Sequence, residues 1–259
     1  MTYALSLLRT AAGLAAVLAV WPPRARADAP RVEELLARAD ALAREARAAP
    51  DEDKARAVDV ALEAYAAVIR RRPKDGKLVP RVRRRRASLL KHAGRAGDAL
   101  AEYDAIVEGR ARRKDKARAL YDGGRLLERG GDFHGAGERY ERAVEEYRDV
   151  IRVRAQASLA RGRVLERMRR PREAERAYCH VVDKCRDEAE AVIGAYDALA
   201  LLALKEGRSR DARRWLQTCT DRFAKRAARD DRYGRFVARL LGSMKAPAAF
   251  RRAAAEDPG

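Results

Sequence analysis

The chain carries few of the side chains that perform covalent chemistry, and their spacing suits no common catalytic or metal site. Its three histidines, His92, His134 and His180, share no spacing typical of metal ligands. His180 follows Cys179 directly, but adjacent residues on a helix point about 100° apart and cannot form a nucleophile–base pair. Serine is rare, and no serine lies in a nucleophile-elbow sequence. We therefore expect no enzymatic activity, no cofactor and no metal ion.

The three cysteines are Cys179, Cys185 and Cys219. The first two lie six residues apart on one expected helix, which separates them by about 9 Å along the axis and about 120° around it, too far for a disulfide. An internal disulfide would therefore have to include Cys219, with either of the other two, and would leave one thiol free. The simpler interpretation is that all three are small apolar packing residues.

Arginine dominates the charge of the chain. Lys and Arg number 58 against 39 Asp and Glu, which gives a formal net charge of +19. Such a balance is typical of proteins that bind polyanions. The chain also has no Asn and only four Ile, a composition that GC-rich codons produce and that raises the arginine content by itself. Two interpretations of the arginines therefore stand side by side, a ligand-binding role and a compositional origin.

Residues 1–27 have the pattern of a secretory signal peptide. An apolar run at 11–21 follows Arg9, a Pro-Pro break stands at 22–23, and 25–27 supply a small-x-small cleavage sequence. The apolar run is too short to span a bilayer core of about 30 Å. We expect cleavage after residue 27, with an uncleaved anchor as the alternative, and export to the periplasm or cell envelope. Nucleic acid is therefore not the expected partner.

The rest of the chain has the periodicity of amphipathic helices, with no alternating β-branched segments that would predict strands. One helix is expected to open at Pro30, and a second, N-capped by Asp51, to end at Pro73. Four helix pairs follow, joined by turns short enough to make the two helices of each pair antiparallel neighbours. A last helix at about 230–243 would cap the final pair. The four pairs are expected at 81–93 with 96–108, 113–129 with 134–149, 151–168 with 171–184, and 187–206 with 209–224.

These pairs carry a sequence repeat of 37 to 38 residues. In each second helix an alanine is followed four positions later by a large residue, so both lie on one helix face. A period of this length is typical of a solenoid, in which each unit buries its apolar face against its neighbours. The recurring pairs are Ala61 with Tyr65, Ala99 with Tyr103, Ala136 with Tyr140, Ala174 with Tyr178, and Ala212 with Leu216.

Two further positions of the unit are filled consistently. A small residue stands in the first helix at Ala87, Gly124, Gly162 and Ala200, and the turn seven positions later holds Gly94, Gly131, Arg169 and Gly207. Read together, the four positions resemble tetratricopeptide repeats. In that family the small residues let the two helices approach closely, the turn glycine ends the first helix, and the aromatic residue fills the gap between neighbouring units.

The resemblance implies an all-α, right-handed superhelical solenoid of antiparallel helix pairs. It would occupy residues 28–245, including the capping helix, with a flexible tail at 246–259. The chain departs from the family pattern in its longer period, the usual one being about 34 residues, and in Arg169, which replaces a turn glycine. Long-period repeats behind a signal peptide are similar to bacterial cell-envelope members of the family, although no lipid-anchor cysteine is present.

In this family a concave groove lined by first-helix residues binds the partner. Carried over to this chain, the groove is basic through its middle, with Tyr121 and Leu159 as apolar footholds. Arginine suits bidentate capture of carboxylates, so the expected occupant is an acidic, extended or helical segment of a partner protein. The alternatives are a basic module that binds envelope polyanions, either acidic polysaccharide or anionic lipid, and an accessory subunit of an envelope complex.

Nine residues are candidates for lining this groove. In the arginine run at 83–86, only Arg84 is expected on the groove face, and the other three are expected at a solvated helix start. The candidates are Arg84, Lys91, Arg118, Tyr121, Arg125, Arg129, Leu159, Arg163 and Arg167.

Overall fold

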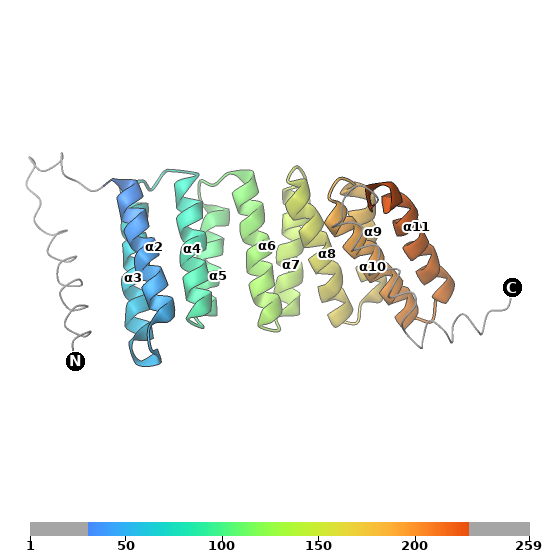
Figure 1. Cartoon of the computed structure of the whole chain (residues 1–259), viewed down its shortest axis with the longest axis horizontal. Helices are drawn as coiled ribbons and strands as arrows, with labels where there is room; N and C mark the ends of the chain where they lie inside the picture. Colours follow the sequence, from blue (N-terminus) through green and yellow to red (C-terminus); the bar gives the residue numbers. More distant parts are fainter. Residues whose placement is uncertain (1–30, 228–259) are drawn as a thin grey trace, which may run out of the picture. The chain divides into compact units, whose positions relative to one another are not determined.

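The computed structural model describes residues 31–227, which form ten α-helices joined by short turns and no strand (Figure 1). The all-α prediction is confirmed for this part of the chain. The expected signal peptide at 1–27, capping helix at 230–243 and tail at 246–259 lie outside it. The helices are α2 Val32–Ala48, α3 Asp51–Arg71, α4 Leu78–His92, α5 Ala96–Glu108, α6 Arg113–Arg129, α7 Phe133–Glu146, α8 Ile151–Arg167, α9 Pro171–Lys184, α10 Ala189–Lys205 and α11 Ser209–Ala227.

The chain forms two compact units, which divide between Asp115 and Lys116, so that all of α6 after its first three residues belongs to the second unit. In the first unit α2, α3, α4 and α5 pack in succession, and α2 also contacts α4. In the second unit α7, α8, α9, α10 and α11 pack in succession, and α8 also contacts α10. This pattern is the one expected of stacked antiparallel helix pairs. A single continuous domain over 28–245 stays a prediction.

The observed helix boundaries correct the expected ones by a few residues. α4 begins at Leu78 rather than 81, because Asp75 Oδ1 accepts hydrogen bonds from the backbone N–H groups of Lys77 and Leu78 at 2.9 and 2.8 Å. Asp51 is the first helical residue of α3 and not its N-cap, a position that Pro50 takes. Among the helices of residues 31–227, none combines the length and the apolar character that crossing a membrane requires.

The first helices of four pairs end in the same way. The second residue after the helix has a left-handed backbone, and the N–H of the residue that follows it bonds to the carbonyl oxygen five positions earlier at 2.8 to 3.0 Å, which is a Schellman motif. The turn glycines therefore have the predicted role. Arg169 adopts the same conformation despite its Cβ, which costs about 1–2 kcal/mol relative to a right-handed residue. The φ angles are 74° at Gly94, 84° at Gly131, 56° at Arg169 and 75° at Gly207.

The recurring tyrosines are buried against the small residues of their own helix pairs. Tyr140 and Tyr178 are both 0% exposed. A Cβ added at Gly124 would lie 2.6 Å from Tyr140 Cε1, and one at Gly162 would lie 2.2 Å from Tyr178 Cε1. Glycine at these two positions is therefore what allows the first and second helices to approach so closely. Tyr178 also belongs to the buried cluster that extends through α10 and α11, as the resemblance implied.

Candidate binding face

All nine predicted groove residues lie on first helices of the pairs. The first unit contains two of them, both on α4, and the second unit contains the other seven on α6 and α8. We describe the two units separately. α4 carries Arg84 and Lys91, α6 carries Arg118, Tyr121, Arg125 and Arg129, and α8 carries Leu159, Arg163 and Arg167.

In the first unit, the predicted cations of α4 are already engaged by other residues of the protein. Arg84 Nη2 lies 3.4 Å from Asp115 Oδ1. Asp115 is only 4% exposed and also pairs with Arg112 at 2.8 Å. The Lys91 ammonium lies 6.0 Å from the centre of the Tyr103 ring. Neither Arg84 nor Lys91 is therefore a free cation that a ligand could take without displacing an internal contact.

The expectation of a solvated helix start at Arg83, Arg85 and Arg86 is wrong. All three side chains are half-buried. Glu102, 8% exposed, pairs with Arg83 at 3.0 Å and with Arg86 at 3.2 Å, and Arg85 bonds to Asp40. The reason is that α4 contacts α2, α3 and α5, so a run of four arginines has no fully solvated side and is neutralised by acids of α2 and α5.

In the second unit, Tyr121 lies beneath two guanidinium groups. The side chain is 9% exposed, and its ring centre lies 5.8 Å from that of Tyr140. The guanidinium carbons of Arg118 and Arg125 lie 5.3 and 5.9 Å from the ring centre, within the range of cation–π attraction. Arg118 also pairs with Asp122 at 3.1 Å. The two guanidinium groups therefore cover most of the Tyr121 ring, and little of the ring is accessible to a partner.

Four arginines of α6 and α8 remain exposed and make no hydrogen bond or ion pair with other described residues. On each helix the two lie four positions apart, so both side chains leave the same side of the helix. The two helices are neighbours, since Arg118 Nη1 lies 3.4 Å from Gln156 Oε1 of α8. We name this surface the arginine face. It consists of Arg125, Arg129, Arg163 and Arg167.

Two carboxylates share the arginine face, and both are held by buried tyrosines. The Tyr140 hydroxyl donates to Glu128 Oε2 at 2.7 Å, and the Tyr178 hydroxyl donates to Glu166 Oε1 at 2.5 Å. Burial, together with the hydrogen bond to the carboxylate, raises the pKa of both tyrosines far above the usual value, so both remain protonated donors. Glu166 also accepts a bond from Lys205 at 2.7 Å. Neither carboxylate forms an ion pair with the four arginines.

Glu128 and Glu166 also lie at positions that line the groove in the family, but their hydrogen bonds with the buried tyrosines were not predicted, although a signal for these pairs is present in the sequence. Each lies 12 residues before the large residue of the second helix. The same spacing brings Lys91 over the Tyr103 ring. In the last pair the two positions are both leucine; Leu216 belongs to the apolar core, and Leu204 is partly buried and packs against it. In each helix pair, the residues at these two positions therefore have side chains that can interact favourably with each other. The four pairs are Lys91 with Tyr103, Glu128 with Tyr140, Glu166 with Tyr178, and Leu204 with Leu216.

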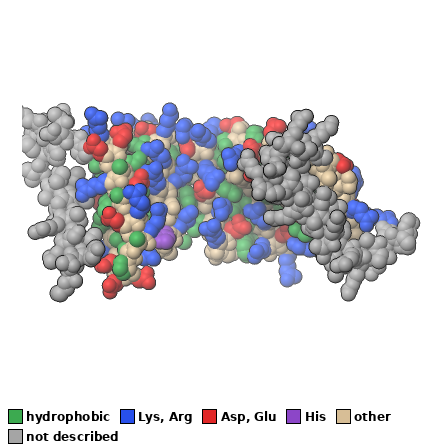
Figure 2. Space-filling view, viewed as in Figure 1, with side chains coloured by type: hydrophobic (Ala, Val, Ile, Leu, Met, Phe, Trp, Pro, Cys, Tyr) green, Lys and Arg blue, Asp and Glu red, His purple; other side chains and the backbone are tan. Residues whose placement is uncertain are grey.

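Apolar surface near the arginine face is limited. Leu159 is half-buried, packs against the core, and lies 3.2 Å from the position a Cβ would take at Gly194. Leu201, at the position of α10 that corresponds to Arg163 of α8, is 49% exposed. On the face that Figure 2 shows, Lys and Arg side chains are spread among Asp and Glu rather than collected in one large patch.

The cysteines have the predicted packing role. Cys185 and Cys219 are 0% exposed in the core of the second unit, and Cys179 packs against it. All three are free thiols. Burial raises the pKa of Cys219 to about 12, which keeps the thiol protonated and unreactive. In the part of the chain that the structure describes, no group of three or more His, Cys, Asp or Glu residues could hold a metal ion.

Comparison with known proteins adds a likeness of fold. No protein-family model matches the chain, and neither does any curated protein. One solved structure of MamA is 20% identical, with 69% of this chain and 96% of that chain covered and a TM-score of 0.49. A second MamA structure is 19% identical, with 72% and 94% covered and a TM-score of 0.48. A likeness of this size assigns neither a family nor a function. The class that the helix pairs themselves define is a helical-repeat protein of tetratricopeptide-like form.

Proposed function

We propose that this protein is an exported scaffold, without catalytic activity, that binds an acidic segment of a protein partner at the arginine face. One observation carries the proposal: two adjacent helices present four guanidinium groups that no described residue neutralises. The location in the periplasm or cell envelope rests on the signal-peptide pattern at 1–27.

The geometry favours carboxylate groups as the ligand. A guanidinium group binds a carboxylate through two parallel hydrogen bonds, and such charge-assisted bonds contribute about 1.5–3 kcal/mol each. The Tyr121 ring restricts the side chain of Arg125 through a cation–π contact, so Arg125 loses less side-chain entropy when it binds a carboxylate. Glu128 and Glu166 lie on the same helices as the arginines and repel a partner whose acidic residues are out of register with the guanidinium groups. The expected partner therefore has acidic residues spaced to reach side chains one helical turn apart.

A second candidate is a basic module that binds envelope polyanions such as acidic polysaccharide or anionic lipid. The observation that favours it is that exposed arginines without an ion pair also occur away from the arginine face, for example Arg172 on α9 and Arg213 and Arg214 on α11. A polyanion would use all of these and would tolerate the loss of any few. Its binding would also fall steeply with salt. If the protein is instead an accessory subunit of an envelope complex, it would bind that complex through the arginine face, as in the proposed scaffold function.

The test compares two charge reversals of equal size in affinity capture from envelope extracts at about 0.15 M salt. One variant changes Arg125, Arg129, Arg163 and Arg167 to Glu. The control changes Arg172, Arg186, Arg213 and Arg214 to Glu, which are exposed and make no ion pair. We expect the unaltered chain and the control to retain the same defined protein and the first variant to lose it. Equal losses in both variants, or recovery of diffuse polyanions by the unaltered chain, would contradict the proposal and favour the second candidate.

A further inference from the structure

A cavity of about 380 Å³ lies between the first half of α8 and the start of α10. The two helices are in contact near it, since a Cβ at Gly194 of α10 would lie 3.2 Å from Leu159 of α8. All the residues that line the cavity belong to the second unit. They are Arg152, Gln156 and Leu159 of α8, and Asp187, Glu188, Ala189, Glu190 and Ala191 at the start of α10.

The lining of this cavity carries an excess of negative charge. Asp187, Glu188 and Glu190 supply three carboxylates, and the single guanidinium group is that of Arg152. None of these four side chains makes a hydrogen bond or an ion pair with another described residue. At least two carboxylates therefore remain without a counter-charge even when Arg152 approaches the third. Acidic residues at the start of a helix are stabilised by the helix dipole, so their charge alone indicates no ligand.

The cavity also has an apolar wall, which the helix dipole does not explain. Ala189 and Ala191 are 4% and 9% exposed, and Leu159 is half-buried. A lysine or arginine side chain has a long aliphatic stem and a charged end. It can therefore place the stem against this wall and the charge beside the carboxylates, whereas an acidic side chain would be repelled and an apolar one would leave the carboxylates unpaired.

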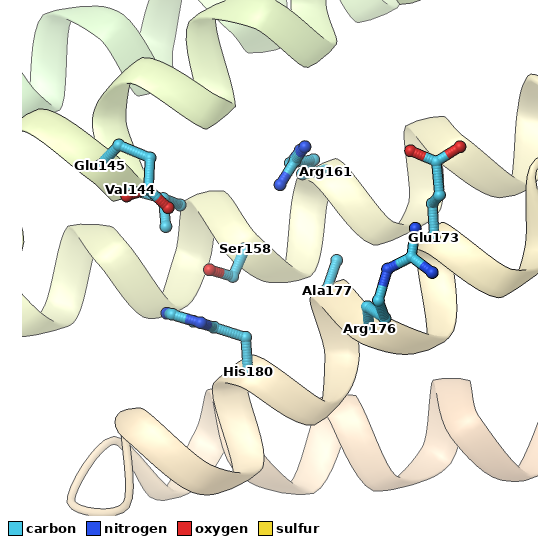
Figure 3. Close-up of a pocket in the computed structure, with 8 residues that line it drawn as sticks. All are labelled: Val144, Glu145, Ser158, Arg161, Glu173, Arg176, Ala177 and His180. Atoms are coloured by element: carbon cyan, nitrogen blue, oxygen red, sulfur yellow. The ribbon is translucent and has the colours of Figure 1, made fainter.

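The second cavity of this unit, between α7, α8 and α9, has a volume of about 220 Å³ and differs in both respects (Figure 3). Its charged groups have partners within the protein, as in the pair of Arg161 with Glu141 at 2.6 Å. Figure 3 shows Arg176 directed toward Glu173 and away from His180. The polar groups of that cavity do not converge on one ligand, and we assign no binding role to it.

The cavity between α8 and α10 lies on the same side of α8 as the arginine face. Gln156, Leu159, Arg163 and Arg167 follow one another at intervals of three or four residues, so they span only about 80° around the helix axis. At 1.5 Å per residue, Arg163 and Arg167 lie about 8 and 14 Å along α8 from the midpoint of Gln156 and Leu159. One extended segment bound along α8 would therefore reach both the arginines and the cavity.

We propose that the partner segment is bipolar: a lysine or arginine side chain occupies this cavity, while two acidic side chains pair with Arg163 and Arg167. This inference rests on the proposed function, because the arginine face holds the acidic half of the segment. Side chains two residues apart in an extended segment point to the same side and lie about 7 Å apart. A basic residue with acidic residues two and four positions away would thus place its charges about 7 and 13 Å apart, close to the spacing along α8.

The experiment measures the binding of short peptides to the full chain by fluorescence anisotropy at about 0.1 M salt. The probes are fluorescein-labelled Lys-Ala-Glu-Ala-Glu and its reversed sequence, because charge does not determine the direction of the bound chain, and the tighter of the two is used further. Norleucine in place of lysine keeps the aliphatic stem without the charge, and glutamine in place of both glutamates removes the acidic half. We expect each replacement to weaken binding about three- to fivefold, as for one or two exposed ion pairs.

Two variants of the protein locate the binding of the lysine. The cavity variant combines Asp187→Asn, Glu188→Gln and Glu190→Gln. The control variant removes the same charge from exposed acids of the first unit that make no ion pair with described residues, and combines Glu45→Gln, Glu52→Gln and Asp53→Asn. We expect the lysine and norleucine peptides to bind equally to the cavity variant and to keep their difference in the control. Circular dichroism checks that both variants are folded.

The outcomes separate this inference from the proposed function. If norleucine binds as tightly as lysine, or if the difference persists in the cavity variant, the cavity takes no basic side chain, while a loss on replacing the glutamates still supports the arginine face. If the lysine matters and the glutamates do not, the arginine face is contradicted and the cavity remains as the site of a basic side chain. If no peptide binds, both proposals are contradicted.

Discussion

Helix α4 of the first unit and helices α6 and α8 of the second unit are all rich in arginine, but they use it in different ways. On α4, Arg83, Arg84, Arg85 and Arg86 all pair with acidic side chains of neighbouring segments. On α6 and α8, the four arginines of the arginine face pair with none of the described residues. The number of arginines on a helix therefore does not distinguish a structural role from a ligand-binding one. The position of the acidic side chains on neighbouring elements does distinguish these two roles.

The difference follows from where carboxylates become buried. Glu102 and Asp115 are 8% and 4% exposed, and each accepts two guanidinium groups. A carboxylate removed from water is stable only when cations or donors surround it, so the arginines of α4 hold these acids in place. In the second unit, buried tyrosine hydroxyls do this for Glu128 and Glu166. The four arginines of the arginine face therefore form no ion pair with these two carboxylates.

The largest expected effect comes from removing the shared acid of α4. Glu102→Gln leaves Arg83 and Arg86 half-buried without a counter-charge and should lower the free energy of unfolding by about 2–3 kcal/mol. The matched control is Glu141→Gln, because its pair with Arg161 is exposed and should contribute less than about 1 kcal/mol. Urea unfolding followed by circular dichroism measures both. Equal changes in the two variants would show that the arginines of α4 are no more structural than surface ones.

The second expected effect concerns the spacing that holds α8 in place. In Gly162→Ala the new methyl group would lie 2.2 Å from Tyr178 Cε1, so the buried ring must move, which should destabilise the protein by about 1–3 kcal/mol. The control is Gly137→Ala on α7, whose methyl group would make an ordinary 3.8 Å contact with Val164. That variant should be stabilised by up to about 1 kcal/mol through helix propensity. A stable Gly162→Ala would mean that the close approach of α8 and α9 is not essential.

A smaller effect is expected from the tyrosine that holds Glu166. Tyr178→Phe keeps the ring but removes the hydrogen bond, and should cost about 1 kcal/mol because Lys205 still pairs with the carboxylate. If Glu166 is thereby released, it can approach Arg163 or Arg167, so capture of an acidic partner should also weaken. Unfolding and capture measured on the same variant test both parts. A loss of stability with unchanged capture would separate the tyrosine–glutamate pair from the binding face.

Local patterns in the sequence were sufficient to predict the helices and their pairing. The turn glycines, the alanine–tyrosine spacing and the 37- to 38-residue period depend on neighbours within one or two helical turns or within one pair. The left-handed residue of the turn is also predictable, because Gly94, Gly131 and Gly207 occupy the same position of the repeat as Arg169. The sequence also placed Arg125, Arg129, Arg163 and Arg167 on one side of their helices, since the helical period alone determines this.

Which arginines are free could not be predicted from one helix at a time. Arg83, Arg85 and Arg86 form ion pairs with Asp40 on α2 and Glu102 on α5, residues that lie 45 and up to 19 positions away in the chain. The sequence pattern of α4 gives no sign of either acid. The cavity beside His180 is equally hidden, because it needs side chains from three helices and the unoccupied space between them. Pairing across helices, rather than composition, separates the structural from the available charges.

The smallest expected effect is the sharpest test of the comparison. Arg163→Gln and Arg167→Gln together should change the free energy of unfolding by less than about 0.5 kcal/mol, since neither guanidinium makes an ion pair with a described residue. The matched variant, Arg83→Gln with Arg86→Gln, should cost several times more, because it leaves Glu102 buried and unpaired. Both variants remove two charges from one helix, so long-range electrostatics cannot explain a difference. Equal stability of the two variants would remove the distinction between structural and available arginines, and with it the reason for assigning the arginine face to a partner.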